Sequence, residues 1–119
     1  MPARDRLFVY RPGFVDPALG DARWFCPYSA QVMGFLGYYP ALAASLELIE
    51  LDFPRPRAPL VALLGPDHQA APMLVLGDAA PRADVAGVVV GEANGHRFVS
   101  KTLEILRWLA ATRGGPEPH

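Results

Sequence analysis

The order in which strand-like and helix-like segments alternate is the feature of this sequence that most restricts its fold. Leu7–Tyr10 is a short apolar run closed by a Pro-Gly turn, which is typical of a strand. Helical periodicity begins after Cys26, and the stretch from Glu47 to Phe53 then alternates apolar and polar side chains as a strand does. Two strands separated by a helix in this way form a parallel crossover, so we expect an α/β protein.

The second half of the chain continues this alternation. Proline near the start and glycine past the end predict a helix from about Ala58 to Leu64. Met73–Leu76 is apolar throughout, which indicates a strand covered on both faces. Asn94-Gly95 is a strong turn signal, with Arg97–Val99 as the returning strand and Val88–Val90 as a candidate partner. These elements predict a mixed four-stranded sheet with helices on both faces.

The last helix is expected to begin at Ser100 or Thr102, because both are good N-cap residues, and to end at Gly114. Residues 11 to 25, in contrast, show no regular pattern and are predicted to form a long loop. The periodicity of the last helix predicts a buried stripe on one face, with Trp108 beside it. The stripe consists of Leu103, Leu106, Leu109 and Ala110.

Composition and charge exclude several classes of function. Eleven basic residues balanced by twelve acidic ones give a net charge of −1, which argues against nucleic-acid binding. No apolar stretch is long enough to span a bilayer, and the polar start lacks the apolar core of a signal peptide. The single cysteine can form no internal disulfide. We therefore expect one domain (residues 1–119) in the cytoplasm, with no membrane or nucleic-acid partner.

The only cysteine, Cys26, stands at the predicted start of the first helix, in the sequence Cys-Pro-Tyr-Ser. There its sulfur meets unpaired backbone N–H groups and the positive end of the helix dipole, both of which favour the reactive thiolate. Ser29, one turn further on, could donate a hydrogen bond to the sulfur. The alternative is that Cys26 is a buried residue acting as a small hydrophobe. If it reacts, an external thiol has to resolve any mixed disulfide, because no second cysteine is present.

This order of elements, with Cys-Pro-Tyr-Ser opening the first helix, resembles the thioredoxin fold and, within it, the monothiol glutaredoxins. In that fold a cis-proline precedes the third strand beside the cysteine, and Ala71-Pro72 matches it in position. The resemblance implies that Cys26 and Ser29 are catalytic. It also implies that the backbone at Ala71 and Pro72 pairs with glutathione or an extended peptide, with Tyr28 gating the thiol or stacking on the ligand. Glutathione is then a co-substrate, and no tightly bound cofactor is expected.

Across its whole length the chain also looks like a family of small bacterial thioredoxin-like proteins that is known only as a domain of unknown function. That resemblance implies the fold but no activity. It rests on the Cys-Pro motif and on three further stretches, namely Arg11-Pro12-Gly13-Phe14, Phe53-Pro54-Arg55-Pro56-Arg57 and the Pro-Glu-Pro-His end.

Three departures from the glutaredoxin pattern bear on glutathione binding. Residues 11 to 25 are inserted before the cysteine, Ala70-Ala71-Pro72 replaces Thr-Val-Pro, and the Gly-Gly-x-Asp element has no match after the last strand. Arginines near the motif are candidates to bind a glutathione carboxylate, Arg11 among them. The others are Arg23, Arg55 and Arg57, of which the last two are better explained as solvated loop charges.

Two functions of different classes are compatible with the sequence. The first is a monothiol, glutaredoxin-like thiol–disulfide oxidoreductase whose partner is glutathione or a protein thiol or disulfide. The second is a non-catalytic binding or assembly module, in which aromatic side chains form an interaction surface or a homodimer contact. The aromatic side chains of this surface are Trp24, Phe25, Tyr38 and Tyr39.

No metal is expected, because His68 and His96 lack the spacing of a zinc site.

Overall fold

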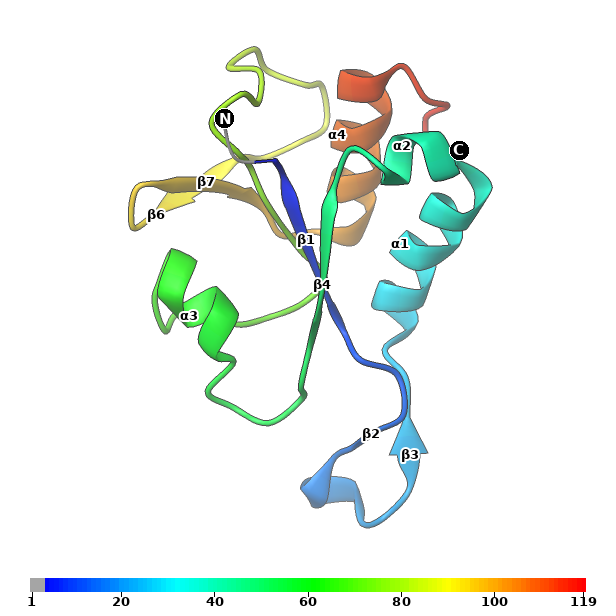
Figure 1. Cartoon of the computed structure of the whole chain (residues 1–119), viewed down its shortest axis with the longest axis vertical. Coiled ribbons are helices and arrows are strands. Elements are labelled where there is room, and N and C mark those ends of the chain that lie inside the picture. Colours follow the sequence, from blue (N-terminus) through cyan, green and yellow to red (C-terminus); the bar gives the residue numbers. More distant parts are fainter. Residues whose placement is uncertain (1–3) are drawn as a thin grey trace.

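A mixed sheet of five strands forms the centre of the protein, whose computed structural model describes residues 4–119 (Figure 1). Strand β1 (Arg6–Tyr10) pairs in parallel with β4 (Glu47–Leu51) and antiparallel with β5 (Met73–Val75). Strand β7 (His96–Val99) lies antiparallel between β5 and β6 (Gly91–Ala93). The strand order β4-β1-β5-β7-β6 confirms an α/β protein with a mixed sheet, and β1 and β4 are the predicted parallel pair.

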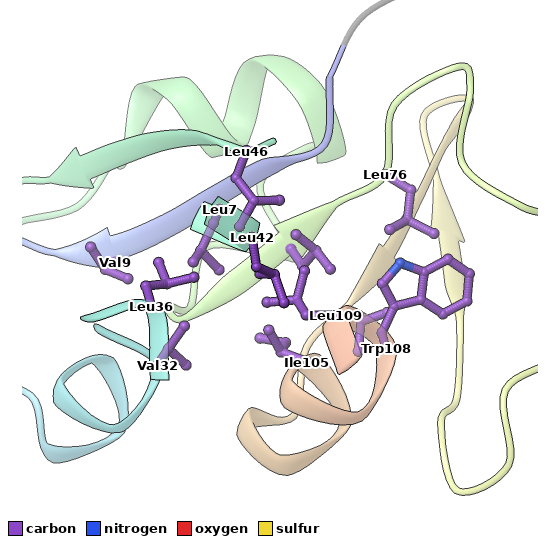
Figure 2. Close-up of a cluster of buried hydrophobic side chains, with 12 residues drawn as sticks. Leu7, Val9, Val32, Leu36, Leu42, Leu46, Leu76, Ile105, Trp108 and Leu109 are labelled. Atoms are coloured by element: carbon purple, nitrogen blue, oxygen red, sulfur yellow. The ribbon is translucent and has the colours of Figure 1, made fainter. Parts of the chain in front are cut away.

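Helices cover both faces of the sheet. Successive residues of a strand point to opposite faces, so β1 supplies side chains to a core on each side. Leu7 and Val9 of β1 pack in the larger core with residues of three helices, α1, α2 and α4 (Figure 2). Phe8, between them, belongs to a second core with residues of α3. Within residues 4–119, no helix is long and apolar enough to cross a membrane. The helices are α1 (Pro27–Tyr38), α2 (Pro40–Ala43), α3 (Ala58–Leu64), whose bounds are those predicted, and α4 (Thr102–Arg113).

The prediction of four strands is wrong, and the hairpin of β6 and β7 shows why. Asn94 and Gly95 form the predicted turn, with φ angles of 51° and 79°. A two-residue turn of this kind pairs the residues that directly flank it, so Ala93 faces His96. The residues just before the turn therefore form β6 as a fifth strand at the edge of the sheet. Val88–Val90, the candidate partner strand, lies in the preceding loop.

The buried face of α4 also differs from the predicted one. Its N-cap residue is Lys101 rather than Ser100 or Thr102, and no side chain caps the helix by a hydrogen bond. Trp108, placed beside the predicted stripe, is fully buried, whereas Leu103 within that stripe is 50% exposed. Leu109 and Ala110 are buried as predicted, so the predicted stripe is wrong at Leu103 and in leaving out Ile105 and Trp108.

Residues 11–25, predicted as a loop, form an arm that extends away from the main sheet (Figure 1). The arm contains a short hairpin of β2 (Phe14–Val15) and β3 (Arg23–Trp24), with a 3₁₀ turn at Pro17–Leu19 between them. Phe14 stacks on Phe53 with ring centroids 4.5 Å apart and an interplanar angle of 4°. This stack attaches the arm to the loop after β4, and the arm then leads directly into Cys26.

Candidate functional site

The structure places the cysteine sulfur at the first turn of α1. Cys26 is the N-cap residue, with an extended backbone, and its Sγ accepts a hydrogen bond from the backbone N–H of Ser29 at 3.4 Å. Pro27 follows in the first turn, where its missing N–H removes no helical hydrogen bond. Cys26 is partly exposed, so it is not a fully enclosed core residue. The sulfur therefore lies at the amino end of a twelve-residue helix, in contact with one of its unpaired backbone N–H groups.

Ser29 contributes to the site in two ways. Its backbone N–H donates to the sulfur, and its buried side chain accepts a hydrogen bond at Oγ from the backbone N–H of Tyr10 at 3.2 Å. The hydrogen bond at the sulfur therefore comes from the main chain of Ser29 rather than from its hydroxyl, which was predicted to donate there. The hydroxyl instead attaches the start of α1 to the end of β1.

Tyr10 was not among the predicted site residues, although it connects several parts of the site. It is the last residue of β1, and its hydroxyl accepts a hydrogen bond from the backbone N–H of Ala71 at 3.2 Å. Its ring centroid lies 6.0 Å from that of Phe14 and 5.7 Å from that of Phe53. Its position in the sequence was the available signal, because the carboxyl ends of strands are where open α/β sheets form their binding sites.

Arg57 is a second residue whose role only the structure reveals. It is 6% exposed, so the interpretation as a solvated loop charge is wrong. The guanidinium carbon lies 4.8 Å from the ring centroid of Tyr10 and 5.1 Å from that of Phe53, which is a cation–π arrangement. Its Nε and Nη1 donate, each at 2.9 Å, to the backbone oxygens of Phe53 and Gln69. These contacts replace water around the cation and join the loop after β4 to the segment before β5.

The arginine that was predicted to contact a ligand at the motif lies elsewhere. Arg11 Nε donates to Asp52 Oδ1 at 3.1 Å, and both side chains are exposed. Arg11 and Arg23 line a groove of about 440 Å³ at the base of the arm. Cys26 does not line this groove, and Arg11 lines neither of the two clefts that Cys26 lines.

Clefts open on both sides of the motif. On one side, a cleft of about 450 Å³ brings Tyr28 together with Ala71-Pro72, a pair joined by a cis peptide bond, and with the first residues of α4. We call this the α4 cleft. On the arm side lie two clefts, of about 390 and 260 Å³, which share Tyr10, Phe25 and Cys26. Tyr28 lines the α4 cleft and one of the arm-side clefts, so the motif lies between the two sides.

The fold and the site together define an α/β protein with a partly exposed cysteine at the start of a helix, between two sets of clefts. The chain belongs to a family described as protein of unknown function (DUF3088), whose model matches residues 4–117. No curated protein and no solved structure matches the chain. Within residues 4–119, no group of three His, Cys, Asp or Glu side chains is placed to hold a metal ion.

Proposed function

We propose that this protein is a thioredoxin-like, monothiol thiol–disulfide oxidoreductase in which Cys26 is the nucleophile and glutathione the co-substrate. The observation that carries the proposal is the position of the sulfur at the N-cap of α1, where it accepts the N–H of Ser29. That N–H and the amino end of the helix lie where charge shifts on the sulfur during thiol–disulfide exchange. Cys26 is partly exposed and lines two surface clefts, which suits a cysteine that reacts with an external disulfide.

The arrangement of the elements supports a thioredoxin-like assignment. A parallel pair, β1 and β4, encloses α1 in the sequence, and the antiparallel strands β5 and β7 and then α4 follow. Ala71-Pro72 directly precedes β5, as the resemblance requires. The arm at residues 11–25 and the edge strand β6 are additions to that plan.

The chemistry is a pair of thiol–disulfide exchanges. The Cys26 thiolate attacks the glutathione sulfur of a mixed disulfide between glutathione and a second thiol. A bond forms between Cys26 and glutathione, the original disulfide bond breaks, and the second thiol leaves as a thiolate that takes a proton from water. A second glutathione thiolate then attacks the Cys26 adduct, which forms oxidised glutathione and restores the Cys26 thiolate. An external thiol performs this step because Cys26 is the only cysteine.

The α4 cleft is where the structure offers most to glutathione, whose two carboxylates favour cationic surroundings. Lys101 and Arg107 line the cleft with positive charge, against the single carboxylate of Glu104. That carboxylate already accepts the N–H of Val89 at 2.6 Å and lies 4.0 Å from Lys101 Nζ. The backbone N–H groups in the first turn of α4 add further positive potential.

The backbone edge at Ala71 is only partly available to glutathione. Its N–H already donates to the hydroxyl of Tyr10, so a ligand can use this donor only after that bond opens. Ligand binding in the α4 cleft therefore depends mainly on the helix start and on Lys101.

Intact-mass measurement after exposure to oxidised glutathione at neutral pH tests the proposal. We expect one glutathionyl adduct in the wild-type protein and none in Cys26→Ser. The adduct should disappear when reduced glutathione is added, because the external thiol resolves it. Absence of the adduct from the folded wild-type protein would refute the proposal.

A non-catalytic binding module is the second candidate, because several large apolar side chains around the motif are exposed. Phe25 is 63% exposed and Trp24 41%. The two candidates differ in the reactivity of the sulfur, which alkylation measures. If Cys26 in the folded protein is alkylated no faster than in the urea-unfolded chain across the neutral range, the binding module is favoured.

A further inference from the structure

The two clefts on the arm side of Cys26 share three of their lining residues, and we call the pair the arm trough. The part along α1 and β1 has a volume of about 390 Å³ and the part along the arm about 260 Å³. Tyr10, Phe25 and Cys26 line both parts, so the cysteine borders each of them. The aromatic and aliphatic side chains that line the trough include Phe14, Leu19, Trp24, Phe25, Met33 and Phe53.

Four large apolar side chains that line the trough are exposed to solvent. Leu19 is 61% exposed and Phe25 63%, while Trp24 and Met33 are 41% and 40% exposed. Exposed side chains of this size that gather around one depression mark a surface that other molecules cover. The arm supplies most of them, and α1, which supplies Met33, contains no charged residue. A strongly hydrated ligand would not remove this apolar surface from water, so the lining favours an apolar ligand.

The charges that line the trough have one sign. Asp16 and Glu50 line it, and no lysine or arginine does within residues 4–119. Asp16 accepts the N–H of Ala18 at 3.0 Å as the cap of the 3₁₀ turn. This hydrogen bond holds its carboxylate close to the backbone of the arm. Glu50 lies on β4, an edge strand, is exposed, and forms no ion pair with the described residues. The α4 cleft, in contrast, carries Lys101 and Arg107.

From these observations we infer that the arm trough binds a polypeptide segment of a substrate protein, with an apolar side chain next to the reacting cysteine and a lysine or arginine flanking it. The apolar side chain fits the aromatic lining, and the flanking cation complements Asp16 and Glu50. This inference rests on the proposed function, since the segment carries the disulfide that Cys26 attacks. Glutathione, with its net negative charge, occupies the α4 cleft on the other side of Tyr28. The thiolate that leaves in the first exchange is then the cysteine of the segment in the trough.

Four short peptides, each carrying one glutathionylated cysteine, test the inference. Their neighbouring residues combine apolar or polar side chains with lysine or glutamate flanks. The second-order rate constant of deglutathionylation is measured for each peptide with the full chain. We expect the apolar, lysine-flanked peptide to react fastest, about tenfold or more ahead of the polar, glutamate-flanked one. Added salt should reduce the lysine preference, because Glu50 is exposed and Asp16 is partly exposed.

Two variants assign the preference to the trough. Glu50→Gln should reduce the preference for lysine over glutamate flanks by about two- to fivefold, as expected for an exposed charge pair. Glu92→Gln on β6, at the opposite edge of the sheet, is the matched control and should behave as the wild type does. Equal rates for all four peptides, or a preference that Glu50→Gln leaves unchanged, would overturn the inference.

A binding measurement separates failure of the inference from failure of the proposed chemistry. Cys26→Ser is titrated with the same peptides carrying serine in place of cysteine, and the emission of Trp24 in the trough is recorded. Trp108 is buried in the core and provides a constant background. If Cys26→Ser binds the apolar, lysine-flanked peptide selectively while the wild-type protein does not react with the glutathionylated peptides, peptide binding in the trough is supported and the oxidoreductase function is refuted. A concentration-dependent dimer that Phe25→Ser dissociates would show instead that a second copy covers the trough, and would overturn the inference.

Discussion

The hydroxyl of Tyr10 accepts a hydrogen bond from the backbone N–H of Ala71, 61 residues away in the chain, at 3.2 Å. The backbone N–H of Tyr10 in turn donates to Ser29 Oγ. The backbone N–H of Tyr10 therefore joins the end of β1 to the helix that carries the sulfur, and its hydroxyl joins the same strand end to the residue pair before β5. This relationship places Tyr10 at the centre of the candidate site, although it has no reactive chemistry of its own.

Tyr10→Phe should weaken the fold and open the edge at Ala71. Loss of the hydroxyl leaves a part-buried N–H without its partner, so we expect the free energy of unfolding to fall by about 1 kcal/mol. The same N–H becomes available to the backbone of an extended ligand, so glutathionylated peptides should react faster with Cys26. Urea denaturation and the deglutathionylation rate measure the two effects. Tyr38→Phe, at a tyrosine that is 80% exposed, is the control and should change neither.

Ser29→Ala separates the hydroxyl of Ser29 from its backbone N–H. The variant removes the acceptor of the Tyr10 N–H in a buried position, so the free energy of unfolding should fall by about 1–2 kcal/mol. The N–H that reaches the sulfur is retained, so the rate of alkylation of Cys26 in the folded protein should hardly change. A large fall in that rate, with the fold intact, would show that the hydroxyl itself acts on the sulfur. Ser100→Ala, at an exposed serine, is the control.

Arg57→Ala should be much more costly than the same change at the neighbouring arginine. Arg57 loses its contacts with two rings and two backbone oxygens, all within a buried setting, so we expect a loss of about 2–4 kcal/mol. Arg55 is exposed, and Arg55→Ala should fall within about 0.5 kcal/mol of the wild type. Equal losses in urea denaturation would contradict the assigned role of Arg57.

Arg113→Ala should lower the stability of the protein, because Arg113 at the end of α4 pairs with the residue just before β1. Arg113 Nη2 donates to Asp5 Oδ2 at 2.9 Å, and Asp5 is 7% exposed. Removing the cation leaves a buried carboxylate whose one remaining partner within residues 4–119 is the N–H of Gly77 at 2.7 Å, so we expect a loss of about 3 kcal/mol. Thermal unfolding measures it, with Arg82→Ala, at an exposed arginine, as the control. A midpoint for Arg113→Ala that matches the control would contradict the prediction.

The sequence by itself determined the elements whose signals are local. The bounds of α3 follow from Pro59 and Gly65, and the hairpin turn follows from Asn94-Gly95. Cys26 could be placed at the start of α1 because Pro27 and the periodicity after it mark the first turn. These features depend on backbone geometry and hydrogen bonds within a few residues, and neighbouring side chains encode them directly.

Only the tertiary structure decided the contacts that join distant segments. The rotation of α4 about its axis depends on how Trp108 fits beneath the sheet, and helical periodicity alone allows several phases. Arg57 is buried because the loop after β4 meets the ring of Tyr10, and the hydroxyl of Tyr10 reaches Ala71 because β1 and β5 are neighbours in the sheet. Sheet order brings these residues together across long stretches of chain, and no short pattern of residues specifies that order.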